Sequence, residues 1–97
     1  MKALFISYNQ SLTECVQYVL EKNMVRGHTK MPLTHGRGSV SGEPHYGTHA
    51  WPAVNSSILA IVEDDQVNPL LDDLRKLDAK AEQHGVRAFV WEVVGQM

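Results

Sequence analysis

The order of periodic segments along the 97 residues constrains the fold more than any single motif does. Two segments, 11–23 and 66–84, place apolar residues at helical spacing. Four shorter runs favour strands because they are apolar and rich in β-branched or aromatic residues: 2–8, 28–34, 57–62 and 87–94. The order is therefore strand, helix, strand, long loop, strand, helix, strand.

This order predicts an α+β fold of the ferredoxin-like βαββαβ type, in one domain over residues 1–97. We expect a two-layer sandwich, in which a four-stranded antiparallel sheet carries both helices on one face. The long loop joins the second and third strands. Within the strand 28–34, Pro32 has no N–H group and therefore favours a sheet edge, a bulge or a strand end.

Local signals predict how the two helices start and end. Ser11 and Glu14 have the spacing of a capping box at the start of the first helix. Pro69 must lie in the first turn of the second helix, where a missing N–H costs little. Gly85 predicts a glycine C-cap after this helix. Cys15 lies within the apolar stripe of the first helix, and we expect it to be a small core residue.

The last predicted strand is apolar on both of its sides. Phe89 and Trp91 alternate with Ala88 and Val90, and the run continues to Val94. Because two helices cover only one face of a four-stranded sheet, the second face needs another cover. Further copies of the same chain, packed sheet to sheet, would provide it. We therefore expect a homo-oligomer.

Composition excludes several classes of protein. The formal charge is −2 and no basic cluster occurs, which argues against a nucleic-acid-binding protein. The single cysteine rules out an intrachain disulfide and a four-cysteine zinc site. No apolar run approaches the length of a membrane span, and the start of the chain lacks the pattern of a signal peptide. We expect a cytoplasmic protein without membrane insertion.

The segment from Gly27 to Asn55 differs from the rest of the chain. It holds four of the five histidines, five of the seven glycines and three of the four prolines. Residues 36–52 are too many and too glycine-rich for a tight hairpin, and loops of this length are uncommon without a role. The segment therefore predicts a functional loop, although a surface loop without any ligand remains the other interpretation.

Two kinds of ligand suit this segment. Backbone N–H groups of the glycine-rich residues 36–42, with Arg37 as a charged donor, suit an anion, although the Gly-Lys-Ser/Thr ending of a P-loop is missing. Imidazoles suit a transition-metal ion, within one chain or shared between chains. The candidate metal ligands are His28, His35, His45 and His49. No set of residues has the spacing of a catalytic site, so we do not expect an enzyme and name no catalytic residues.

These features resemble the nitrogen-regulatory P-II signalling proteins and their P-II-like relatives. The order of elements, the length and the long loop between the second and third strands are similar. Gly27-x-Thr29 precedes the second strand, and Gly36-x-Gly38 opens the loop. An apolar third strand runs into an acidic turn over residues 58–65. The form of the loop is similar to that of a divergent branch.

The resemblance implies a homotrimer whose sheets face inward and which binds adenine nucleotides in clefts between subunits. The ligand-binding residues that it implies are Gly27, Thr29, Gly36, Arg37 and Gly38. The long loop, residues 36–52 here, is the T-loop of that family and engages a partner protein, such as a membrane transporter or a regulator.

The chain also departs from this family. Standard members carry several basic residues around and after the last strand, whereas Arg87 is followed by AFVWEVVGQM. Phosphates would therefore lack part of their usual counterions. Our leading hypothesis is a trimeric P-II-like regulator that binds an adenine nucleotide or an ion near the base of its loop. The alternative is a metal-binding sensor or metal-handling protein that uses the loop histidines, and an enzyme on this common fold is a third hypothesis.

Overall fold

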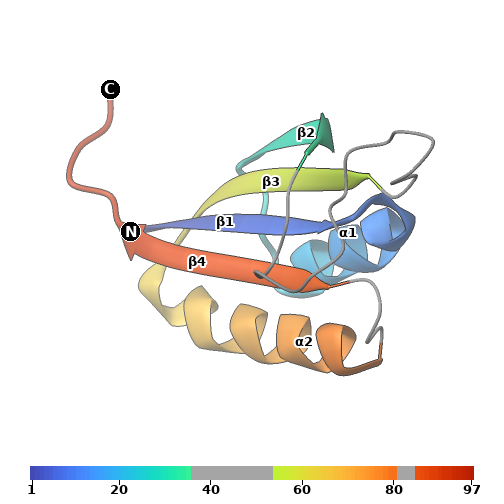
Figure 1. Cartoon of the computed structure of the whole chain (residues 1–97). Coiled ribbons are helices and arrows are strands. Elements are labelled where there is room, and N and C mark those ends of the chain that lie inside the picture. Colours follow the sequence, from blue (N-terminus) through green and yellow to red (C-terminus); the bar gives the residue numbers. More distant parts are fainter. Residues whose placement is uncertain (36–53, 81–84) are drawn as a thin grey trace.

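The computed structural model describes residues 1–35, 54–80 and 85–97. It has two layers, a four-stranded sheet and two helices that cover one of its faces (Figure 1). The strands are β1 Lys2–Asn9, β2 His28–Thr34, β3 Asn55–Val62 and β4 Val86–Glu92. The helices are α1 Thr13–Lys22 and α2 Val67–Lys80, preceded by the 3-10 turns η1 Gln10–Leu12 and η2 Asp64–Gln66. The predicted α+β ferredoxin-like fold is confirmed.

The sheet has the strand order β2-β3-β1-β4, and each neighbouring pair is antiparallel. β2 therefore lies at one edge, next to the central strand β3. The register of this pair shifts between Met31 and Thr34, on either side of Pro32. Of the alternatives predicted from Pro32, the edge position is confirmed, and the pairing is also irregular at this residue, because a residue without an N–H group cannot donate to a ladder.

The core lies between the helices and one face of the sheet. In β1, Leu4, Ile6 and Tyr8 alternate along this face and have no exposed surface. The helices contribute buried apolar side chains at helical spacing to the same cluster: Val16, Val19, Leu20, Leu70 and Leu74. None of the described helices is long and apolar enough to cross a membrane.

The opposite face of the sheet is also apolar but is not covered by either described helix. Phe5 lies between Leu59 of β3 and Phe89 of β4, and the next row brings Ile61 and Trp91 to the two sides of Ala3. Phe89 is 61% exposed, Trp91 49% and Ile61 43%. We call the surface formed by Phe5, Leu59, Ile61, Phe89 and Trp91 the open face. The two-sided apolar pattern of the last strand is thus confirmed, but Val94 lies beyond the end of β4 and is exposed.

The first helix starts differently from the prediction. The amide of Ser11 donates to Asn9 Oδ1 over 2.9 Å and so begins the turn η1. Leu12, at the N-cap of α1, makes no side-chain cap bond. The capping box predicted at Ser11 and Glu14 is therefore wrong, because the Asn9 carboxamide caps this start two residues earlier.

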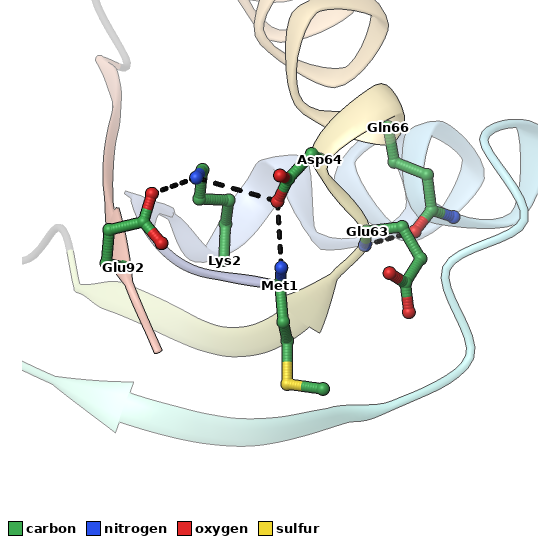
Figure 2. Close-up of polar contacts among 6 residues, drawn as sticks. All are labelled: Met1, Lys2, Glu63, Asp64, Gln66 and Glu92. Carbon is green, nitrogen blue, oxygen red and sulfur yellow. Dashed lines mark hydrogen bonds and ion pairs between the residues drawn. The ribbon is translucent and has the colours of Figure 1, made fainter. Parts of the chain in front are cut away.

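A capping box forms instead before the second helix. The Glu63 amide donates to Gln66 Oε1 over 2.8 Å (Figure 2), and the Glu63 side chain accepts from the Gln66 amide. Gln66 Nε2 also donates to the carbonyl of Asn23, which follows α1, over 3.1 Å. This cap therefore links the start of the second helix to the end of the first. Pro69 lies in the first turn of α2, as predicted.

Two other local predictions concern Cys15 and Gly85. Cys15 is exposed, so its predicted core position is wrong. It is one residue before the buried Val16, and one residue turns the helix by about 100°. Gly85 has φ 71°, the left-handed conformation predicted for a glycine after a helix. The predicted helix end itself, over residues 81–84, lies outside the described residues.

Charged groups join the start of β1, the end of β4 and the turn η2 (Figure 2). Lys2 Nζ contacts the Glu92 carboxylate and lies 3.5 Å from Asp64 Oδ1. The Met1 ammonium group donates to the same Asp64 oxygen over 2.8 Å, and this bond lowers the pKa of Asp64. Because ion pairs in water contribute little to stability, the apolar core stabilises the fold more than this cluster does.

Candidate ligand site at the base of the loop

The two ends of the long loop lie at the same end of the sheet. Thr34, the last residue of β2, pairs with Asn55, the first residue of β3. Asn55 in turn pairs with Asn9 at the end of β1, and the amide of Gln10 donates to the carbonyl of Val54 over 2.9 Å. The base of the loop therefore lies beside the turn that leads into α1 (Figure 1).

Side-chain hydroxyls hold the two strands together at this base. Ser56 Oγ donates to the carbonyl of Pro32 over 2.6 Å, and Thr34 Oγ1 and Ser57 Oγ lie 3.0 Å apart. Both serines are buried. The Ser56 hydroxyl thus gives the carbonyl of Pro32 a partner where the register of the two strands shifts, and buried polar groups require partners. The base of the loop is therefore held together by specific side-chain hydrogen bonds.

Tyr8 lies in the core below this base. Its side chain is fully buried, and its hydroxyl forms no hydrogen bond with any residue that the structure describes. Burial raises the pKa of Tyr8, while the nearby hydroxyls of Thr13 and Ser56 act in the opposite direction. Those two hydroxyls donate to the carbonyls of Gln10 and Pro32. A buried phenol without a partner costs free energy relative to a satisfied one.

Gly27 and Thr29, two of the predicted ligand-binding residues, lie at the other end of β2. The carbonyl of Gly27 accepts from the amide of Ile61 over 3.1 Å. Among the described residues, a Cβ atom on Gly27 would meet only the Ile61 carbonyl oxygen, at 3.9 Å, so the space that they leave does not require glycine. Thr29 is exposed and pairs with Leu59 of the open face. Thr29 and Thr34 are five positions apart along the extended strand, or about 16 Å.

The predicted metal ligands are only partly described. His28 is the first residue of β2, and His35 directly follows its last residue, so the strand holds them about 20 Å apart. One ion cannot bind both within one protomer. Among the residues that the structure describes, no group of three or more His, Cys, Asp or Glu side chains is placed to hold a metal. His45 and His49 lie outside the described residues, as do Gly36, Arg37 and Gly38.

Sequence reasoning missed the polar residues at the base of the loop. Asn9, Thr34, Ser56 and Ser57 all contribute bonds there. The sequence feature that could have revealed them is the Asn-Ser-Ser run at residues 55–57, directly before an apolar run. Polar residues at the end of an apolar strand indicate hydrogen-bond partners from another segment. The sequence-based boundary at residue 57 excluded most of this run.

Solved structures of similar architecture are available for comparison. CPII, a nitrogen regulatory PII-like protein from Thiomonas intermedia K12, bound to ADP, AMP and bicarbonate, has a TM-score of 0.71 and 23% sequence identity. The match covers 95% of this chain and 86% of CPII. A structure of CPII bound to ADP and bicarbonate gives a TM-score of 0.70 and 27% identity, over 93% of this chain and 82% of CPII. This protein has the P-II-like fold.

A second P-II-like protein supports the same conclusion. A protein from Thermus thermophilus, assigned to the PII-like signalling proteins, matches with a TM-score of 0.65 and 20% identity. This match covers 93% of the present chain and 83% of the other. No protein-family model and no curated protein matches the sequence. The resemblance to P-II-like proteins that the sequence predicts is therefore confirmed by structure.

Proposed function

We propose that this protein is a cytoplasmic, trimeric P-II-like regulator without enzymatic activity. It binds an adenine nucleotide or a small anion near the base of its loop, residues 36–52, and controls a partner protein through that loop. The observation that carries the proposal is the match to CPII, a nitrogen regulatory protein whose structures contain ADP, AMP and bicarbonate. The partner class is a membrane transporter or another regulator.

The open face supports the trimer. Phe89 and Trp91 leave about half or more of their surface in water, and Ile61 lies on the same face, across Ala3 of β1 from Trp91. Burial of apolar area is favourable by about 25 cal/mol per Å², so an apolar sheet face gains free energy by packing against copies of itself. A closed ring of protomers satisfies this face without leaving an open end.

The geometry of β2 supports a site between subunits. Gly27 and Thr29 lie at one end of this strand, and the loop that contains Gly36, Arg37 and Gly38 starts at the other end. A compact ligand cannot span the strand within one protomer. The site therefore takes Gly27 and Thr29 from one subunit and the start of the loop from its neighbour.

The charge at the end of the chain sets a preference among ligands. Arg87 is the single basic residue of β4, and its guanidinium lies 3.5 Å from Asp78 and donates to the carbonyl of Val86. Few cations therefore remain for a polyphosphate, which is held by charge-assisted bonds. We therefore expect any preference for ATP over AMP and bicarbonate to be smaller than at a site with several basic residues.

Calorimetric titration with AMP, ADP, ATP and bicarbonate tests the site. Gly27→Asp places a negative charge where there is room for a side chain, so an anionic ligand should bind about tenfold or more weakly. Asn68→Asp is the matched control, because it adds the same charge at an exposed position of α2, in the helical layer. If none of the four ligands produced heat, the proposed ligand class would be excluded. If both variants bound the ligand equally well, the proposed position of the site would be excluded.

A further inference from the structure

The helical layer contains a groove that the proposed regulator does not use. It has a volume of about 380 Å³ and lies between α1 and α2. Its floor is formed by apolar or weakly polar side chains, namely Cys15, Tyr18, Val19 and Leu77. Tyr18 is 65% exposed, which is high for an aromatic side chain on a helix. An exposed apolar surface of this kind marks a site of interaction more often than an isolated exposed residue does.

The rim of the groove is rich in lysine. Lys22, Lys76 and Lys80 line it, and they are three of the five lysines in the chain. Lys22 Nζ lies 3.4 Å from Asp73 Oδ1, and Asn23 donates to the other oxygen of Asp73. The Asp73 carboxylate thus already has two partners, Lys22 on α1 and Asn23 directly after this helix.

The other two lysines of the rim differ from Lys22. Lys76 and Lys80 form no ion pair within 4 Å with any residue that the structure describes. They are four residues apart on α2 and therefore lie on the same side of the helix. Glu14 is the remaining acidic residue of the lining. The groove is therefore a locally basic surface on a chain whose formal charge is −2.

We propose that this groove binds an acidic amphipathic helix of a partner protein. Apolar side chains of that helix pack on Tyr18, Val19 and Leu77, and its carboxylates pair with Lys76 and Lys80. The lining on α1 extends from residue 14 to residue 22, so the groove is about 12 Å long and fits about two turns of a helix. A helix laid into an apolar groove between two others is a common mode of recognition. Because the contact area is small, the complex is weak and transient.

Charge complementarity decides between possible occupants. A second copy of this chain would bring another lysine rim against the first, which is repulsive. The open face of a second copy consists of apolar side chains, which cannot pair with lysines. An acidic helix satisfies both the floor and the rim. This surface is made of α1 and α2, so the proposal does not depend on the proposed ligand site.

A synthetic peptide of about twelve residues, with leucines along one helical face and glutamates beside them, is the probe. Its binding to the ¹⁵N-labelled full chain is followed by amide chemical-shift changes, which should concentrate in residues 14–22 and 73–80. Lys76→Glu should weaken binding about fivefold, because it replaces an attractive contact by a repulsive one. Arg75→Glu is the matched control. It makes the same charge change on the residue before Lys76 in α2, which does not line the groove.

A second peptide, with lysine in place of glutamate, should bind Lys76→Glu better than the native chain. Tyr18→Ala keeps the charge and should also weaken the acidic peptide, because an exposed side chain is removed from the floor without cost to the core. The proposal is overturned if the acidic peptide fails to bind at millimolar concentration, or if its shifts fall on the open face. It is also overturned if Lys76→Glu and Arg75→Glu weaken binding equally, or if a peptide with the leucines replaced by serine binds as well.

Discussion

The two faces of the sheet are both apolar, yet only one of them is closed within the protomer. Ile6 and Phe5 are neighbours in β1 and point to opposite faces. Ile6 has no exposed surface, because α1 and α2 cover it. Phe5 lies in the middle of the open face, in a row with Leu59 and Phe89. The comparison shows that an apolar strand pattern identifies surfaces that require burial but does not say which chain supplies the cover.

The two faces contribute to stability in different ways. Complete burial of an aliphatic side chain is worth about 1.5–3 kcal/mol, and the covered face gains this when the single chain folds. The open face gains it only when protomers associate. Folding and association are therefore separable, and variants of the two faces should affect different measurements.

The largest expected effect is on the covered face. Ile6→Ala should lower the free energy of unfolding by about 2–5 kcal/mol, because it leaves a cavity among close-packed side chains. Urea denaturation at several protein concentrations measures this. Phe5→Ala is the matched control in the adjacent position, and its cost should depend on protein concentration. If both substitutions lowered the free energy of unfolding equally at every protein concentration, the two faces would not differ in the way proposed.

The next effect is on assembly through the open face. Phe89→Asp should convert the proposed trimer to monomers, because a charge in an apolar interface is strongly unfavourable. Sedimentation equilibrium should then give about one third of the native mass, while circular dichroism remains that of the folded chain. Val94→Asp is the control, since Val94 lies beyond β4 and is 99% exposed. A monomeric native protein would contradict the assembly itself.

A smaller effect concerns Tyr8, a polar residue on the covered face. Because its hydroxyl forms no hydrogen bond with any described residue, Tyr8→Phe removes an unsatisfied buried polar group and should stabilise the protein by up to about 1 kcal/mol. Thermal or urea unfolding would detect this gain. A loss of more than about 1 kcal/mol would instead show that the hydroxyl is hydrogen-bonded, and that the covered face includes a satisfied polar group.

The smallest effect lies outside both faces. The hydrogen bond from Asn23, with help from Lys22, lowers the pKa of Asp73. A carboxylate with a lowered pKa stabilises the folded chain above the ordinary value of about 4, and this contribution is lost as the pH falls through the lowered value. The difference in urea midpoint between native protein and Asp73→Asn should therefore shrink from pH 7 to pH 3. Asn23→Ala should reduce the same difference, and a pH-independent difference would exclude this linkage.

The sequence by itself determined the type and order of the elements. Short apolar runs rich in β-branched and aromatic residues are enough to predict the strands, and apolar residues at a period of 3.6 along α1 and α2 are enough to predict the helices. Pro32 restricted its strand to an edge, a bulge or a strand end for the same kind of local reason. Order and periodicity then sufficed for the fold class, and short glycine motifs for the family resemblance.

Helix starts and individual burial were less predictable. Asn9 caps the first helix in place of Ser11, and Cys15 is exposed although it belongs to an apolar stripe. A cap depends on which of several nearby polar groups reaches the amide, and burial depends on how the helix is rotated against the sheet. The spacing of residues in the sequence does not reveal a shift of one residue in the position of the cap or in the rotation of the helix.

Only the tertiary structure decided which residues come together. It separates Gly27 and Thr29 from the base of the loop along β2, and it holds His28 and His35 too far apart for one ion. It also assembles Ser56 and Ser57 with residues of β2, and it places three lysines around one groove. These contacts join segments that are distant in sequence. Their positions are fixed by strand register and helix packing, which involve the whole chain at once.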